Sequence, residues 1–278
     1  MRHRSFAALA LAAVASLGLA ACGGSGSTSS DASGSSSDVV TLTVGATPSP
    51  HAKILNYVND NLAADAGIKI KVVEYTDYVQ PNTALNDGEL DANFYQTVPY
   101  LENAEKQAGY DFEAGAGIHL EPLGVFSQKH KSLDELPNGG TIGIISDTSN
   151  QERALCLLAT QGLVSIPEGE GDVNVNTVTK LKDFSFNEVE GPQLVRSLED
   201  FDFAVINGNF AQEGGLSLSG DALVVESPVD NPAVNVLVWK AGSDKAAAIA
   251  KLEELLHSDQ VKQYIESTWS DGSVIPAF

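Results

Sequence analysis

Hydrophobic residues in this chain alternate between a strand-like and a helix-like spacing. Residues 39–46 are rich in β-branched and apolar side chains and run into Gly45 and Pro48, as expected for a strand that ends in a turn. The next apolar residues follow a helical period up to Gly67: Ile54, Leu55, Val58, Leu62 and Ala66. Residues 68–75 then return to a strand pattern. A strand–helix–strand unit predicts a parallel strand pair and an α/β layered fold.

The same alternation continues to the end of the chain. Further strands are predicted near 91–95, 141–145, 184–190, 203–206, 223–226 and 234–239, and further helices after Pro81 and over 98–108, 149–162, 192–198, 246–256 and 260–268. We expect two α/β lobes, between which the chain crosses near residues 120–127 and 223–227. One lobe would comprise 39–123 with 225–278, and the other 124–224. Ligands of such folds lie at the carboxyl ends of strands, which places a ligand cleft between the lobes.

The N-terminal segment has the pattern of an export signal. Arg2 and Arg4 precede an apolar run over 6–20 that is interrupted only by Ser16 and Gly18, too short for a membrane span. The tetrad Leu19-Ala20-Ala21-Cys22 resembles the bacterial lipobox, in which Cys22 becomes the lipid-modified first residue. We therefore predict a signal peptide over 1–21, a flexible Gly/Ser-rich linker over 22–38, and a protein anchored outside the bacterial cell membrane through Cys22. An ordinary secretory signal with an incidental cysteine is the alternative.

Charge and cysteine content narrow the class further. Removing residues 1–21 takes away two arginines and leaves 14 basic against 37 acidic residues, a net charge near −23. Such a charge argues against binding to nucleic acid. A lipidated Cys22 leaves Cys156 without a disulfide partner, and its apolar neighbours predict a buried, inert side chain. No later segment reaches membrane-spanning length without charge, so the chain is not itself a permease.

Several segments resemble the methionine-binding lipoproteins of ABC importers (the MetQ/NlpA type). They occur in family order between about residues 42 and 240: Val44–Pro48, Asp77–Asn82, Asp91–Asn93 with following aromatics, Lys131–Leu136, Asn150 to Arg153, Ala204–Asn207, and Val234-Asn235. The resemblance implies a two-lobed periplasmic-binding-protein-like fold that closes on a free amino acid and delivers it to an ABC permease with its ATPase. We expect a monomer without cofactor, metal or catalytic residues.

Arg153 is the predicted partner of a ligand carboxylate. It falls in the first turns of the helix after strand 141–145, where a planar guanidinium adds to the unpaired N–H groups of a helix start. Asn150 would face the ligand one turn earlier. Without the resemblance, a surface arginine paired with Glu152 or Asp147 remains the alternative.

Two asparagines and three tyrosines complete the predicted site. Asn207 ends the strand 203–206 and Asn235 begins another, so their amides could bind ligand ammonium and carboxylate groups; a simple turn-capping role is the alternative for Asn207. The family's aromatic pocket for a thioether side chain corresponds to Tyr78, Tyr95 and Tyr100, which could otherwise be core residues. Thr97 stands where many members have histidine.

Other functions are less well supported by the residues. No nucleophile elbow, zinc-protease motif or phosphate loop argues for an enzyme. The histidines, of which only His51 near a strand end attracts notice, form no close pair with a carboxylate or thiolate at metal-ligand spacing. A surface lipoprotein that binds a protein partner stays open. Within solute binding, another apolar amino acid or a methionyl peptide is the alternative ligand.

Overall fold

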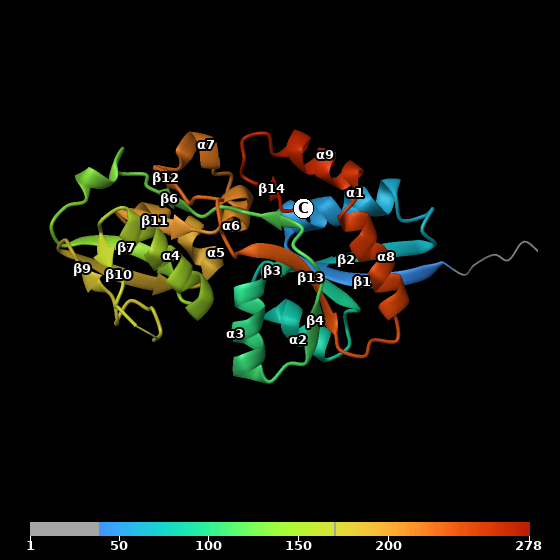
Figure 1. The fold of residues 1–278 in the computed structure, drawn as a ribbon. Coiled ribbons are helices and arrows are strands. Elements are labelled where there is room, and N and C mark those ends of the chain that lie inside the picture. The colour runs from blue at the N-terminus through green and yellow to red at the C-terminus, as the bar shows by residue number, and fades with distance from the viewer. Residues whose placement is uncertain (1–38, 170) are drawn as a thin grey trace, which may run out of the picture. The chain divides into compact units, whose positions relative to one another are not determined.

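The computed structural model describes residues 39–169 and 171–278. The predicted signal peptide, lipobox and linker therefore lie outside the described residues. The strands form two separate larger sheets with helices around them (Figure 1). This is the two-lobed α/β arrangement predicted from the hydrophobic pattern.

The first sheet has seven strands in the order β14-β5-β13-β3-β1-β2, with β4 also paired to β13. They are β1 (Val40–Ala46), β2 (Ile68–Glu74), β3 (Ala92–Thr97), β4 (Phe112–Ala114), β5 (His119–Leu120), β13 (Val234–Lys240) and β14 (Ile275–Pro276). Strand β1 runs parallel to β2 and β3, whereas β13 is antiparallel to β3. The parallel pair expected from the first strand–helix–strand unit is confirmed.

The second sheet has five strands in the order β10-β7-β11-β6-β12. They are β6 (Gly124–Phe126), β7 (Gly140–Ile145), β10 (Phe184–Val189), β11 (Phe203–Ile206) and β12 (Val224–Val225), while β8 (Val164–Ser165) and β9 (Thr179–Lys180) pair separately. The chain enters this sheet between β5 and β6 and leaves it between β12 and β13. These two crossing segments pair with each other, because the backbone N–H of Glu226 donates to the Leu123 carbonyl at 2.9 Å.

Helices connect and cover the strands. They are η1 (Pro48–Ala52), α1 (Lys53–Asn61), α2 (Gln80–Asn86), α3 (Val98–Ala108), η2 (Leu133–Glu135), α4 (Thr148–Thr160), α5 (Gly191–Arg196), η3 (Leu198–Asp200), α6 (Gly208–Glu213), α7 (Leu218–Asp221), α8 (Ala246–Leu256) and α9 (Asp259–Thr268). The first helix ends at Asn61, earlier than its apolar stripe predicts. The chain there turns back into β2, and Gly67, with φ of 68°, donates to the Ala64 carbonyl at 3.0 Å.

Each larger sheet carries an apolar core on both faces. On β13, Leu237 packs with residues of α1, α8 and α9, whereas its neighbours Val236 and Val238 pack with residues of α2 and α3. In the second sheet, Ile144 packs with α4, and the next residue, Ile145, packs with α5 and α6. Successive side chains of a strand point to opposite faces, so helices on both sides bury each strand and hold its carboxyl end in a defined place.

The prediction that Cys156 is buried is wrong, because its side chain is exposed on α4. Leu155 and Leu158 of the same helix are completely buried. Each residue of an α-helix is rotated by about 100° from the one before it, so Cys156 leaves the face that contacts the sheet even though its sequence neighbours are apolar. Across the described residues, none of these helices has the length and apolar character that a membrane span requires.

Gly143 of β7 provides a test of this packing. A Cβ atom at this position would lie 2.6 Å from Cδ2 of Phe201, whose ring is only 2% exposed. We expect Gly143→Ala to lower the free energy of unfolding by about 1–3 kcal/mol, the usual cost of overpacking, as measured by urea denaturation followed by circular dichroism. Gly171→Ala is the matched control, since nothing lies within 4 Å of its Cβ position. Equal losses in the two variants would contradict this account.

Candidate functional site

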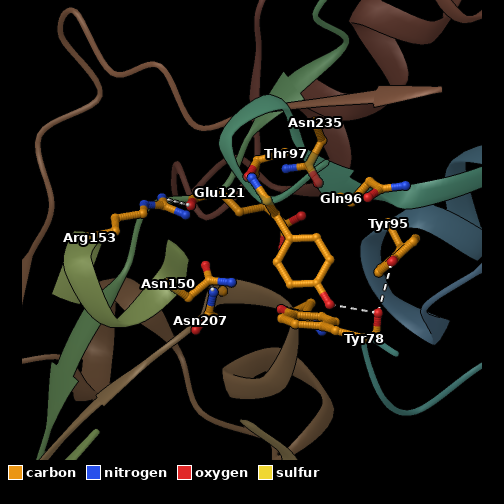
Figure 2. A pocket seen from close by; sticks show the side chains of 12 residues that line it. Tyr78, Tyr95, Gln96, Thr97, Glu121, Asn150, Arg153, Asn207 and Asn235 are labelled. Atoms are coloured by element: carbon orange, nitrogen blue, oxygen red, sulfur yellow. Dashed lines mark hydrogen bonds between the residues drawn. The ribbon is translucent and has the colours of Figure 1, made fainter. Parts of the chain in front are cut away.

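A cavity lies where residues from both sheets meet. Its lining includes all seven residues predicted to bind a ligand, together with five others (Figure 2). The predicted residues are Tyr78, Tyr95, Tyr100, Asn150, Arg153, Asn207 and Asn235; the others are Gln96, Thr97, Glu121, Gly208 and Asn209. The carboxyl ends of β3, β7 and β11 lead directly into most of these positions, as expected for an α/β ligand site.

Arg153 lies on the second turn of α4 and is held by the two crossing segments. Its Nε donates to Oε1 of Glu226 at 2.8 Å, and its Nη2 donates both to Oε2 of Glu226 and to the carbonyl oxygen of Glu121, the latter at 2.7 Å. The partner is therefore Glu226, 73 residues away in sequence, and not Glu152 or Asp147. Nη1 makes no hydrogen bond to another described residue, so its N–H donors are free to bind a ligand carboxylate.

The three asparagines are buried and joined to other polar side chains. Asp147 caps α4 by accepting from the backbone N–H of Asn150 at 2.8 Å, and Asn207 donates to Oδ1 of Asn150 at 2.8 Å. The side chain of Asn207 makes no capping bond to α6, so the turn-capping alternative does not describe it. Oδ1 of Asn235 lies 3.0 Å from Nε2 of His51. These contacts fix the amides in single orientations at the cavity wall.

One backbone carbonyl organises the tyrosines. The hydroxyl of Tyr95 donates to the carbonyl oxygen of Tyr78 at 2.8 Å (Figure 2). The hydroxyl of Tyr100 donates to the same oxygen, also at 2.8 Å. The Tyr78 hydroxyl donates to Oδ1 of Asn209 at 2.5 Å, and its ring stacks on Phe210. Burial raises the pKa of Tyr78 and Tyr95 well above the usual value and also raises that of Tyr100. The hydroxyls thus stay neutral and occupied, and the rings form an aromatic wall.

Thr97, the residue at the position where many family members have histidine, makes a hydrogen bond to the backbone of α3. Its side-chain oxygen accepts from the backbone N–H of Tyr100 at 3.4 Å and caps α3. It also borders the cavity. The substitution by threonine therefore provides a helix cap next to the aromatic wall.

His51, His119 and Glu121 form a buried group that the sequence patterns did not predict. Their candidate ligand atoms all lie within 4.8 Å of one another, so the expectation that no histidine forms a close pair with a carboxylate is wrong. His119 and Glu121 are two residues apart in extended chain, where such residues share a face, and this spacing was the available signal. Burial lowers the pKa of His51 to about 4 and that of His119 to about 3, so both are neutral near pH 7.

Comparison with known proteins agrees with this architecture. The family model of the NlpA lipoproteins matches residues 42–278. The chain belongs to the NlpA lipoprotein family. The methionine-binding lipoprotein MetQ of Bacillus subtilis is 36% identical over 246 residues, which is 84% of this chain and 87% of that protein.

Two solved structures show the same NlpA-type fold. A protein described as a lipoprotein of Actinomyces odontolyticus is 86% identical with a TM-score of 0.85, covering 87% of this chain and all 100% of that one. A nutrient-binding protein of Burkholderia cenocepacia bound to methionine is 35% identical with a TM-score of 0.80, covering 85% of this chain and 100% of that one. The two-lobed fold predicted from the sequence is thus confirmed.

The Tyr78 hydroxyl offers a test of how the cavity wall is held. We expect Tyr78→Phe to lower the free energy of unfolding by about 1 kcal/mol, because Oδ1 of Asn209 loses its donor. Tyr57→Phe is the matched control, since the Tyr57 hydroxyl has no hydrogen bond to a described residue and its ring stacks on Tyr264 at 4.2 Å. Thermal denaturation of the ligand-free proteins measures both effects. A Tyr78→Phe protein as stable as Tyr57→Phe would show that this bond contributes nothing.

Proposed function

We propose that this protein captures free methionine outside the cell membrane and delivers it to an ABC importer. The observation that supports this most strongly is the composition of the cavity wall. A guanidinium and several amides lie beside three tyrosine rings in one cavity, and small-molecule sites likewise combine a few placed polar groups with an aromatic or apolar wall. Relatives of this chain are described as methionine-binding or contain methionine.

Each part of methionine has a matching group in this cavity. The Nη1 donors of Arg153 would bind the ligand carboxylate, aided by Asn150 and Asn207. A thioether is apolar and polarizable, and sulfur beside an aromatic ring gains about 0.3–1.5 kcal/mol, which suits the wall formed by Tyr78, Tyr95 and Tyr100. A charged side chain would be buried there without a partner.

The proposed mechanism is capture without covalent chemistry. We place the lobe boundaries at 39–123 with 225–278 and at 124–224. The strand composition of the two sheets supports this division, except that Val225 of β12 pairs within the second sheet. Lobe closure would bury the amino acid, and the closed form would differ enough from the open one for a permease to recognise it. The protein would act as a monomer that binds no nucleic acid and has no catalytic residues.

Membrane attachment is part of the same proposal. Residues 1–21 would be removed, Cys22 would carry the lipid, and residues 22–38 would tether the folded body to the membrane that contains the permease and its ATPase. Two acyl chains bind a membrane far more stably than one, since each buried methylene contributes about 0.8 kcal/mol.

Calorimetric titration tests the ligand and its carboxylate partner together. The protein, solubilised in detergent and freed of carried-over ligand by unfolding and refolding, should bind methionine in the micromolar range or tighter, with little response to glutamate or leucine. Arg153→Ala should weaken methionine binding by about 2–5 kcal/mol, as expected when one partner of a buried charge pair is removed.

The matched control is Arg196→Ala, because Arg196 is exposed at the end of α5 and does not line the cavity. Wild-type affinity in the Arg153→Ala protein would remove this residue from the site. A response to another amino acid in place of methionine would retain the binding class and change the ligand, whereas no response to any amino acid would favour a protein partner.

The lipid anchor is tested with the two cysteines of the chain. Cys22→Ser should move the protein from the membrane fraction to the soluble fraction, because the hydroxyl cannot take a thioether-linked lipid. Cys156→Ser, which changes an exposed cysteine of the folded body, should leave the protein in the membrane fraction. Membrane retention of the Cys22→Ser protein would contradict the lipobox interpretation.

A further inference from the structure

Glu121 is a buried carboxylate that borders the cavity with one of its two oxygens unused. It lies in the first crossing segment, between β5 and β6, and is only 6% exposed. Oε1 lies 2.9 Å from Nε2 of His119 and 3.3 Å from Nε2 of His51. Oε2 is buried and accepts no hydrogen bond of normal geometry from the described residues, although the backbone N–H of Asn209 lies near enough to the carboxylate to lower its pKa. It faces the same wall as Gly208, whose Cβ position would be 3.3 Å away.

The hydrogen-bond partners of the two histidines assign their protons. Nε2 of His51 is 3.0 Å from Oδ1 of Asn235, which can only accept, so Nε2 carries the proton and Nδ1 accepts from the Thr47 hydroxyl at 2.6 Å. Nε2 of His119 donates to Oε1 of Glu121. The N–H of His119 therefore donates to Oε1 of Glu121, whereas the N–H of His51 donates to Asn235 and its Nε2 lies 3.3 Å from the same Oε1. Both rings pack against this oxygen and hold the carboxylate in one orientation, and neither histidine binds Oε2.

A cationic donor is the group that this oxygen lacks. A buried acceptor without a partner costs free energy, and a carboxylate gains most from a charged N–H donor. The carbonyl of Glu121 accepts from Nη2 of Arg153 at 2.7 Å (Figure 2), so an anion-binding guanidinium and a cation-binding carboxylate lie side by side in one cavity. An α-amino acid has its carboxylate and ammonium on the same carbon, which matches this adjacency.

We propose that Glu121 accepts the ammonium group of the bound amino acid, and that His51 and His119 are positioning residues for its carboxylate. This inference rests on the proposed function and adds a requirement to it: the site selects α-amino acids over the corresponding hydroxy acids. In this proposal Arg153 and Glu121 are the charged partners of the ligand, and the asparagines add neutral hydrogen bonds to its carboxylate and ammonium groups.

A divalent metal ion held by the same three residues is the competing interpretation. Ligation through Nε2 would require His51 to give up its hydrogen bond to Asn235 and His119 to give up its bond to Glu121, because both donors must lose their protons. Moreover, Nδ1 of His119 has no partner among the described residues, whereas metal-bound histidines almost always donate their second N–H to another group. The contacts therefore favour an ammonium.

The decisive experiment compares two ligands on two proteins. Methionine and 2-hydroxy-4-(methylthio)butanoate share carboxylate and thioether, but the second has a hydroxyl in place of the ammonium. Full-length Glu121→Gln protein should lose about 30-fold or more in methionine affinity, since it leaves a buried charge without its partner. Its affinity for the hydroxy acid should change by less than about fivefold, because a neutral hydroxyl gains much less from a carboxylate. Glu266→Gln, an exposed change on α9, is the matched control and should alter neither affinity.

The pH dependence of binding is a second readout. The groups that face Glu121 are His51 of η1, His119 of β5, Arg153 of α4, Glu213 of α6, and Tyr78, which lies between β2 and α2. Burial raises the pKa of Glu121 to about 7 despite the opposing effects of His51, Arg153 and the Asn209 backbone. The ammonium prefers the ionised carboxylate, so methionine affinity should fall as the pH decreases from about 8 to about 5.5. The Glu121→Gln protein should lack this dependence.

The positioning role is tested on the histidine. His119→Ala should weaken methionine binding more than hydroxy-acid binding, and His119→Gln, which keeps an N–H donor, should restore part of the difference. Binding of the hydroxy acid shows that each variant is folded.

Equal losses for both ligands in Glu121→Gln, or zinc binding that the same variant abolishes, would overturn the proposal. If the wild type binds a different amino acid, the proposed function fails, and that amino acid with its own hydroxy analogue tests Glu121 independently.

Discussion

The guanidinium of Arg153 joins the two segments by which the chain passes between its sheets. It donates to the Glu226 carboxylate on the segment between β12 and β13 and to the Glu121 carbonyl on the segment between β5 and β6. The Leu123 backbone N–H donates to the same Glu226 carboxylate at 3.0 Å. A planar fork donor matches such a carboxylate geometrically as well as electrostatically. Arg153 and Glu121 line the cavity, so these contacts fix the part of its wall that lies at the crossing segments.

Burial then determines the charge state of the cavity. The histidines below Glu121 are neutral, the tyrosines keep their protons, and burial raises the pKa of Asp147 at the start of α4 to about 6. Arg153 already has one carboxylate partner in Glu226. Glu121 is then the carboxylate of the cavity wall that is not paired with the Arg153 side chain, so donors and acceptors are separated within the cavity. Such an arrangement suits a zwitterion better than a free anion or cation.

The cavity wall joins side chains of both lobes. Tyr78 follows β2 of the first sheet, yet its hydroxyl and ring contact Asn209 and Phe210 of α6, which follows β11 of the second. Its carbonyl meanwhile holds the other two tyrosines. Opening of the lobes would break the first set of contacts and leave the second intact. The aromatic wall thus belongs to the first lobe and meets Asn150, Asn207 and Asn209 of the second at the cavity.

Much of this protein could be predicted from local patterns. Strand and helix positions agreed with the hydrophobic periods, and α3, α8 and β11 matched the predicted bounds, because backbone conformation follows from which neighbouring side chains share a face. Asn150, Arg153 and Asn207 follow predicted strand ends for the same reason, although the resemblance to a family selected the candidate site residues from other polar residues. The predicted length of α1 and the predicted burial of Cys156 were wrong, since both depend on how each helix packs in the folded chain.

Only the tertiary structure decided which charges meet. Nothing near Arg153 in sequence indicates Glu226, and nothing near His51 indicates Glu121, because these partners come together only when separate elements pack around the crossing segments. Hydrophobic periodicity specifies which face of an element is buried, but not which polar atoms are excluded from water beside one another. That exclusion makes the carboxylate, the histidines and the guanidinium into one site.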